Sequence, residues 1–316
     1  MTDTQNEAFK MPVNKIRLFE HGAPGSQNLK LTRKYYTEDM PDGRVKHIVQ
    51  NITDPDIVPY IPDGIGNSTD RQRIPAVLII PGGAFRRLVY NFEGEDVAKW
   101  LNSMGIAAFV LECRLPSDEH DNAEDVPLID AMRAMRVIRG RAQEFGIDEA
   151  KIGVMGFSAG GFMAALLSTA YESDVYADYK YKDEYDKLSA RPDFAVCSYP
   201  VISIDDCIEA GKRYMSEEQV LERISDSKAK ILHKYNPDKL VRPDMPPVFI
   251  CETDDDRTTL SENSVGFYMA ARKAGVSAEL HIFRTGGHGY GCGDDFAQTG
   301  EWKVLFTKWI KSIGII

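Results

Sequence analysis

The stretch KIGVMGFSAGGFMAALLSTA, residues 151–170, decides the fold of this chain. Its first five residues form an apolar run that predicts a buried strand, and its last nine predict a helix. Between them, small residues surround Ser158 and allow a sharp strand-to-helix turn that keeps the hydroxyl exposed. The N-terminus of the following helix favours negative charge beside that hydroxyl. We therefore expect Ser158 to be a nucleophile.

A serine nucleophile needs a positioned base, which is most often histidine. His288 lies in the glycine-rich segment TGGHGYG, residues 285–291, between an apolar run and the last amphipathic segment, and is therefore the expected base. His281 lies inside that apolar run and is expected to be a packed or surface side chain. The remaining histidines are expected at the surface: His21, His47, His120 and His233.

The imidazole must be held in one tautomer by a carboxylate that also stabilises its charged form. In a site of this kind the chain order is serine, acid, histidine. The run PVFICE, residues 247–252, is followed by Asp254, Asp255 and Asp256, between the serine and the histidine. We expect Asp256 to be the acid, with Asp255 as the alternative.

Backbone donors for a developing oxyanion are expected in PGGAF, residues 81–85, which follows the apolar run AVLII. From that position N–H groups can reach across to the serine, and small residues let the peptide approach closely. We expect the amides of Gly83 and Ala84, together with that of Ala159, to form the oxyanion hole. Each such donor can contribute about 3 kcal/mol to the transition state.

From residue 74 onward short apolar runs alternate with amphipathic segments, which indicates an α/β fold with a mostly parallel central sheet and helices on both faces. The predicted strands are residues 76–80, 106–112, 151–155, 193–199, 247–252 and 278–283. The predicted helices are residues 94–104, 128–145, 159–171, 261–273 and 301–313.

Residues 1–73 have a different pattern, with β-like runs at 15–19, 29–36 and 45–52 before a turn-rich connector at 55–70. We interpret them as an N-terminal antiparallel extension. Residues from about 205 to 244 form a longer insertion with helical character, which is a candidate cap over the site. The whole chain, residues 1–316, is expected to be a single domain.

The composition narrows the function classes. A formal net charge of −10 argues against a nucleic-acid or anionic-membrane partner, because both require clustered Lys and Arg. The first 15 residues carry acids and no apolar run, and no stretch approaches a membrane span, so a cytoplasmic protein is expected. The five cysteines are scattered, without a CxxC pair, and are expected to be reduced, buried thiols.

From about residue 74 to the C-terminus the chain resembles bacterial α/β-hydrolase esterases of the acetyl xylan esterase and carbohydrate esterase type. The stretches that carry the resemblance are PGGAF, EGEDVAKWLNSMGIAAFVLECRLP, PLIDAMRAMRVIRGRAQEFGID, KIGVMGFSAGG, RPDFAVCSYPVIS, ENSVGFYMAARKAGVSAELHIF and GGHGYG. The resemblance implies the α/β-hydrolase fold and supports the acid assignment to Asp256, counted back from ENS at residues 262–264. It also implies acetyl esters of carbohydrates as substrates.

The sequence departs from the family pattern in three places. Ala84 stands where relatives usually have a third glycine, Glu252 where they often have histidine, and residues 257–260 replace the usual Val-Pro ending of the acid loop. None of these departures removes a triad member. They bear on the shape of the acyl pocket and on the acid.

Together these features predict a serine hydrolase of small acyl esters, which needs no metal or organic cofactor. Its partner would be a small-molecule ester, such as an acetylated sugar or oligosaccharide. One alternative is a serine peptidase of the prolyl oligopeptidase type, although no propeller-like repeat precedes the catalytic part. Another is a catalytically silent member of the fold that serves as a binding protein.

Overall fold

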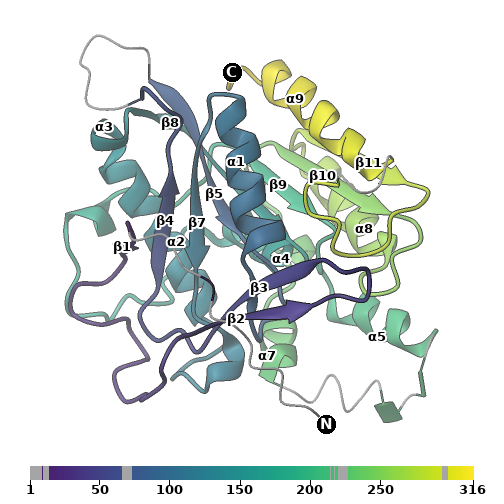
Figure 1. The fold of residues 1–316 in the computed structure, drawn as a ribbon, viewed down its shortest axis with the longest axis horizontal. Coiled ribbons are helices and arrows are strands. Elements are labelled where there is room, and N and C mark those ends of the chain that lie inside the picture. The colour runs from purple at the N-terminus through teal and green to yellow at the C-terminus, as the bar shows by residue number, and fades with distance from the viewer. Residues whose placement is uncertain are drawn as a thin grey trace.

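The structure of the chain is a computed structural model. The structure describes residues 9, 14–65, 73–213, 215–216, 218–219, 227–293 and 298–316. Within these residues, eight strands form one central sheet in the order β1-β4-β7-β5-β8-β9-β10-β11, with β1 on the left and β11 on the right in Figure 1. The strands from β7 to β11 in this order run parallel, whereas β4 pairs antiparallel with both β1 and β7. The predicted mostly parallel sheet with an antiparallel extension is confirmed.

The central strands are buried apolar runs, as expected for a sheet covered on both faces. The bounds of all eight strands, including the less buried edge strands, are β1 (Ile16–Arg17), β4 (Asp56–Tyr60), β5 (Ile74–Ile80), β7 (Ala107–Glu112), β8 (Ile147–Phe157), β9 (Ala195–Ser198), β10 (Val248–Thr253) and β11 (Ala278–Phe283). Each predicted strand from residue 74 onward is present.

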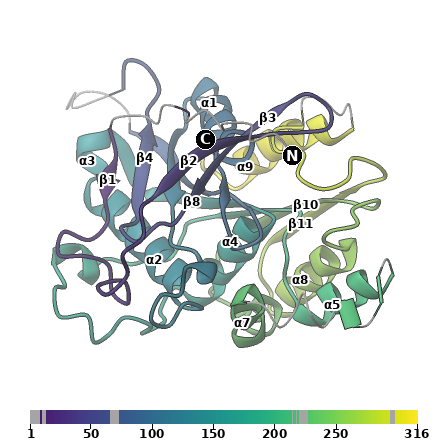
Figure 2. The ribbon, with the colours of Figure 1, turned by 60° about the horizontal axis from the view of Figure 1, so that its bottom comes forward.

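Helices cover both faces of this sheet. Figure 2 shows α1 and α9 on one face and α2, α4 and α8 on the other. Their bounds, with those of the shorter helical segments, are η1 (Asn91–Glu95), α1 (Asp96–Ser103), η2 (Pro116–Asp118), α2 (Val126–Gly140), α3 (Ala142–Phe145), α4 (Ala159–Ala170), η3 (Glu184–Lys187), α5 (Ile204–Lys212), α7 (Ser227–Lys234), η4 (Pro237–Lys239), α8 (Ser261–Lys273), η5 (Thr299–Glu301) and α9 (Trp302–Ser312). On the α1 and α9 face, Trp100 packs edge-on against Trp302, with ring centroids 4.9 Å apart.

A second, three-stranded sheet contains β2 (Lys34–Asp39), β3 (Val45–Gln50) and β6 (Leu88–Val89). The short β6 was not predicted from the sequence. It begins three residues after PGGAF, so this sheet is attached directly to the predicted oxyanion turn. The attachment is reinforced where Tyr90 N donates to His47 O at 2.8 Å.

One sequence prediction for the extension is wrong. Residues 55–70 were expected to be a turn-rich connector, but β4 lies within them and joins the central sheet. The reason is burial, because Ile57 and Val58 are almost fully covered between β1 and β7. Pro59, which lacks an N–H, lies beyond the end of the two-residue partner β1 and so removes no hydrogen bond on that side.

The predicted cap insertion, residues 205–244, contains α5 and α7 between β9 and β10 (Figure 1). Residues 214, 217 and 220–226 of this insertion lie outside the described part. Lys234 and Tyr235, at the end of α7, bind Asp125 at the start of α2, the former at 2.7 Å. A capping role for the insertion, and the single-domain organisation, stay predictions.

The turn between β8 and α4 requires glycine at residue 160, because an added Cβ would lie 1.9 Å from Ile80 O. We predict that Gly160→Ala destabilises the protein by about 1–3 kcal/mol or more, since the clash is with backbone. Gly266, exposed in α8 with no described heavy atom within 4 Å of an added Cβ, is the matched control. Gly266→Ala should stabilise by up to about 1 kcal/mol. Urea unfolding of both variants measures this, and equal stabilities would contradict the prediction.

Candidate active site

Ser158 occupies a strained turn between β8 and α4. Its backbone has φ +54° and ψ −119°, in the region that non-glycine residues rarely adopt. The turn is held from the neighbouring strand, because Ser158 N donates to Ser198 O at 3.0 Å. Gly156 is needed for the close crossing, since an added Cβ would lie 1.9 Å from Gly160 O. This geometry presents the serine side chain at the carboxyl ends of the strands.

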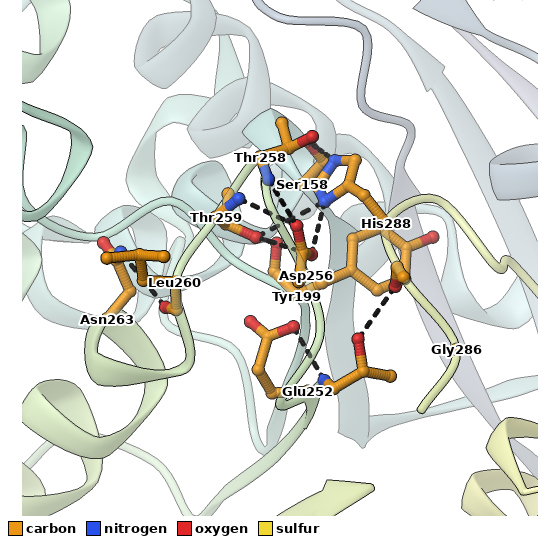
Figure 3. A network of polar contacts seen from close by, with 12 residues as sticks. Ser158, Tyr199, Glu252, Asp256, Thr258, Thr259, Leu260, Asn263, Gly286 and His288 are labelled. Atoms are coloured by element: carbon orange, nitrogen blue, oxygen red, sulfur yellow. Dashed lines mark hydrogen bonds and ion pairs between the residues drawn. The ribbon is translucent and has the colours of Figure 1, made fainter. Parts of the chain in front are cut away.

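The structure brings the three predicted triad residues together (Figure 3). Ser158 Oγ lies 2.9 Å from His288 Nε2, and His288 Nδ1 lies 2.7 Å from Asp256 Oδ2. These contacts fit a neutral imidazole that carries its proton on Nδ1, donates to the carboxylate and accepts from the serine hydroxyl. The three side chains come from the ends of β8, β10 and β11, which are far apart in the sequence.

Asp256 is buried, and both of its carboxyl oxygens accept hydrogen bonds. Its Oδ1 accepts the amides of Thr258 at 2.7 Å and Thr259 at 3.0 Å, and its Oδ2 also accepts the hydroxyl of Thr259 at 3.0 Å. Burial alone would raise the pKa of Asp256, but the hydrogen bond and charge of His288 and these two amides outweigh it and lower the pKa below its usual value. The carboxylate is therefore ionised beside the imidazole.

The alternative acid, Asp255, has a different role in the structure. It is exposed, and its Oδ1 accepts the amides of Gly286 and Gly287 at 2.9 and 2.8 Å. Asp255 thus anchors the loop that carries His288, whereas Asp256 contacts the imidazole itself. The geometry favours Asp256 as the acid.

The PGGAF segment packs directly against the nucleophile. An added Cβ on Gly82 would lie 2.9 Å from Ser158 Cβ and 2.5 Å from Phe157 O. Gly83 and Ala84 both have positive φ, +137° and +57°, so this turn is tightly wound. Neither of their amides donates to a described residue, and Ala159 begins α4, where amides have no intrahelical acceptor. Gly82 and Ala159 thus lie next to Ser158, and the oxyanion roles of Gly83, Ala84 and Ala159 stay predictions.

Sequence reasoning missed two residues of this site, Glu93 and Tyr199. Glu93, in η1, is buried and accepts the amide of Gly82 at 2.8 Å and the hydroxyl of Tyr199 at 3.0 Å. Tyr199 follows β9, and its ring meets that of His288 edge-on at 5.0 Å. Burial raises the pKa of Glu93, against the lowering effects of His288, Gly82 and Tyr199. Both residues lie in stretches that carry the family resemblance, EGEDVAKW and RPDFAVCSYPVIS, but nothing in those stretches assigns either residue to the site.

Glu252, which differs from the usual family residue, is a buried carboxyl behind the acid. It ends the apolar part of β10, is fully covered, and accepts the amide of Thr253 at 2.9 Å and the hydroxyl of Ser264 at 3.3 Å. Burial and the negative charge of Asp256 raise the pKa of Glu252 well above its usual value. A negative charge on Glu252 is therefore disfavoured beside Asp256.

One histidine departs from its predicted surface position. His120 was expected at the surface, but it is buried and bonded to Ser26 Oγ at 3.0 Å, because the loop after β7 packs against the N-terminal extension. Burial lowers the pKa of His120 to about 4.

The described cysteine side chains form no disulfide: Cys113, Cys197, Cys251 and Cys292. Among the described residues, no group of His, Cys, Asp or Glu could hold a metal ion, and no helix has the length and apolar character for a membrane span.

A narrow apolar cavity lies beside the oxyanion turn. Its free space for water-sized spheres is about 10 Å³, which corresponds to about one water molecule. Its walls are largely hydrophobic and include Gly82, Phe85, Leu88, Ala159 and Met163. The residues that line it include Ala159, next to Ser158 in the chain, but neither Ser158 nor His288.

Known proteins share this sequence pattern. A protein-family model described as BD-FAE matches residues 65–270 of the chain. An acetylxylan esterase from Xylanibacter ruminicola is 31% identical over 240 residues, which cover 75% of this chain and 45% of that relative. The chain spans less than half the length of the curated relatives it matches.

Solved structures share the fold over nearly the whole chain. An acetyl ester-xyloside bifunctional hydrolase from Caldicellulosiruptor lactoaceticus has 35% identity and a TM-score of 0.72, covering 96% of this chain and 97% of that one. A thermophilic esterase from Thermogutta terrifontis has 24% identity and a TM-score of 0.64, covering 93% and 96%. The second likeness bears on the fold alone.

The raised pKa of Glu252 gives a pH prediction. A carboxyl that is kept neutral by folding contributes stability that is present below its unfolded pKa and is lost as the pH rises through the raised pKa. Glu252→Gln keeps the shape and cannot ionise. We predict that the unfolding free energy of Glu252→Gln, relative to that of the wild type, increases from about pH 5 to about pH 8. Urea titrations at both pH values test this, and a constant difference between the two proteins would contradict it.

Proposed function

The chain belongs to the BD-FAE family and has the α/β-hydrolase fold, and on that premise we propose that it is a serine carboxylic-ester hydrolase of small acyl esters. The single observation that carries the proposal is the continuous contact from Ser158 through His288 to Asp256, at 2.9 and 2.7 Å. It supports a nucleophile, a general base and an orienting acid in the order that acyl transfer requires.

In the proposed acylation step, Ser158 Oγ attacks the ester carbonyl while His288 Nε2 takes the hydroxyl proton. Asp256 stabilises the imidazolium that forms and keeps Nδ1 protonated. The tetrahedral oxyanion would accept hydrogen bonds from the backbone amides of Gly83, Ala84 and Ala159. Collapse of this intermediate expels the alcohol, which receives its proton from His288.

Deacylation repeats the same chemistry with water. The imidazole takes a proton from the water as it attacks the acyl-serine carbonyl, and the serine leaves with that proton. The positive end of the α4 dipole adds to the stabilisation of the oxyanion. Each step uses groups of this chain alone, so the proposed reaction calls for no cofactor.

We propose acetyl esters of carbohydrates as the substrate class. Two observations support this choice. The relatives described above include an acetylxylan esterase and an acetyl ester-xyloside hydrolase. In addition, the cavity beside the oxyanion turn has room for a methyl group and little more, so an acetyl group fits it better than a longer acyl chain.

The triad assignment is tested by substitution. Ser158→Ala should abolish hydrolysis of nitrophenyl acetate, and Asp256→Asn should lower kcat by about 10⁴-fold, because the asparagine favours the wrong histidine tautomer. Asp254 is exposed in the same loop, so Asp254→Asn is the matched control and should remain near wild type. Asp255→Asn should cost little, since its amide oxygen can still accept from Gly286 and Gly287. A larger loss at Asp255 than at Asp256 would overturn the acid assignment.

The acyl preference is tested with a nitrophenyl ester series. One methylene in a hydrophobic pocket changes discrimination by roughly ten- to two-hundredfold. We predict that acetyl esters are cleaved at least about tenfold faster in kcat/KM than butanoyl esters, and that octanoyl esters are barely cleaved. A flat profile, or a maximum at octanoyl, would reject the deacetylase proposal in favour of a broad or lipase-like enzyme.

The cavity supplies a variant for the same assay. Met163→Ala removes a side chain that lines it and should raise the butanoyl-to-acetyl ratio of kcat/KM. Met132 is an equally buried methionine on α2 that does not line this cavity, so Met132→Ala controls for general loosening of the core. An equal shift in both variants would mean that the cavity does not hold the acyl group. Release of acetate from acetylated xylo-oligosaccharides then tests the sugar.

A further inference from the structure

Glu93 is a buried carboxyl whose position the triad chemistry does not explain. It lies in η1, the segment that follows β6, and only 5% of its surface is exposed. Among the described residues it forms no ion pair with a lysine or arginine, although such a pair is the usual partner of a buried carboxylate. Its recorded side-chain partners are instead two groups of the active site. A buried carboxyl costs free energy unless it is well bonded, so this placement calls for a role.

The first partner is the oxyanion turn. Gly82 N donates to Glu93 Oε2 at 2.8 Å, and Gly82 directly precedes the two expected oxyanion donors of that turn. An added Cβ on Gly82 would lie 2.8 Å from the same carboxyl oxygen and 2.9 Å from Ser158 Cβ. The carboxyl therefore packs on the side of the turn that faces the nucleophile and fixes the direction of its peptide.

The second partner is Tyr199, which connects Glu93 to the histidine loop. Its hydroxyl donates to Glu93 Oε1 at 3.0 Å and accepts the amide of Gly291 at 3.1 Å. Gly291 lies three residues after His288. The Tyr199 ring also packs edge-on against the rings of His288 and Tyr290, with centroids 5.0 and 4.5 Å apart.

We propose that Glu93 is a positioning residue for ester hydrolysis, which joins the oxyanion turn to the histidine loop through Gly82 and Tyr199. The two loops have different tasks in each step, because one binds the oxyanion and the other carries the histidine that moves the proton. Their separation must be fixed for both to act on one tetrahedral centre, since a misplacement of about 1 Å can cost about a hundredfold in rate. The inference rests on the proposed esterase activity of Ser158.

The chemistry of the carboxyl group suits this bridge. Glu93 needs two acceptor oxygens, because both partners donate to it, and a carboxyl group offers them on one side chain. An amide at residue 93 can accept from only one of them. Tyr199 must in turn donate and accept at once, which phenylalanine cannot do. Single-atom substitutions can therefore break one half of the bridge at a time.

The test uses nitrophenyl acetate hydrolysis with Glu93→Ala, Glu93→Gln and Tyr199→Phe. Glu93→Ala should lower kcat about a hundredfold, while KM changes much less, because the loops act on the transition state. Glu93→Gln keeps one bond and should recover part of that loss. The double variant Glu93→Ala/Tyr199→Phe should be little worse than Glu93→Ala alone, because both substitutions remove the same bridge.

The matched control is Glu112→Gln. Glu112 is also fully buried, but it bonds Lys15, Arg33 and Tyr35 in the extension and contacts neither active-site loop. Its amide variant should lower the melting temperature and leave kcat unchanged where the protein is folded. If Glu93→Ala does not fold, Glu93→Gln and Tyr199→Phe decide, with a drop in kcat of about tenfold expected for each.

The outcomes separate the two proposals. If the wild type is active, Ser158→Ala is inactive and the folded Glu93 and Tyr199 variants keep kcat within about threefold, the bridge is overturned and the esterase function stands. If the single-variant losses multiply in the double variant, Glu93 and Tyr199 act separately and the bridge is also overturned. If wild type and Ser158→Ala are equally inactive, the proposed function fails, and the positioning role fails with it.

Discussion

The site depends on how closely three stretches of backbone approach one another at the carboxyl end of β8. The turn at Ser158, the first turn of α4 and the end of β5 meet where an added Cβ on Gly160 would lie 1.9 Å from Ile80 O. This contact fixes α4 against β5, and the segment that follows β5 is the oxyanion turn. The proposed nucleophile and the start of the expected oxyanion turn are thus placed largely by main-chain packing.

Buried carboxyl groups then define the electrostatics around this backbone frame. His288 and two amides hold the pKa of Asp256 below its usual value, whereas burial and the charge of Asp256 raise the pKa of Glu252 behind it. The two adjacent carboxyls are thus shifted in opposite directions. Glu252 adds bulk behind the acid, and its environment disfavours a second negative charge beside the imidazole.

Much of this fold could be predicted because its signals are local. Helix α8 and strand β11 have the bounds that the apolar pattern gave, and the elbow at Ser158 follows from small residues between a strand and a helix. Strand β4 was missed because Pro59 and nearby turn residues hid a short buried run, whose strand state depends on pairing with β7, about 50 residues away in sequence. His120 was missed for a similar reason, since its burial depends on the extension.

The same distinction applies within the site. Ser158, His288 and the acidic run could be proposed because each lies in a loop whose composition indicates its chemistry, and Asp256 was favoured over Asp255 among three adjacent aspartates. Glu93 and Tyr199 are 106 residues apart, and Tyr199 and Gly291 are 92 apart, so no pattern along the chain links them. Only the strand order brings the loops after β5, β9 and β11 to one edge. A sequence can therefore indicate which groups react, while the groups that hold them in register are set by the topology of the sheet.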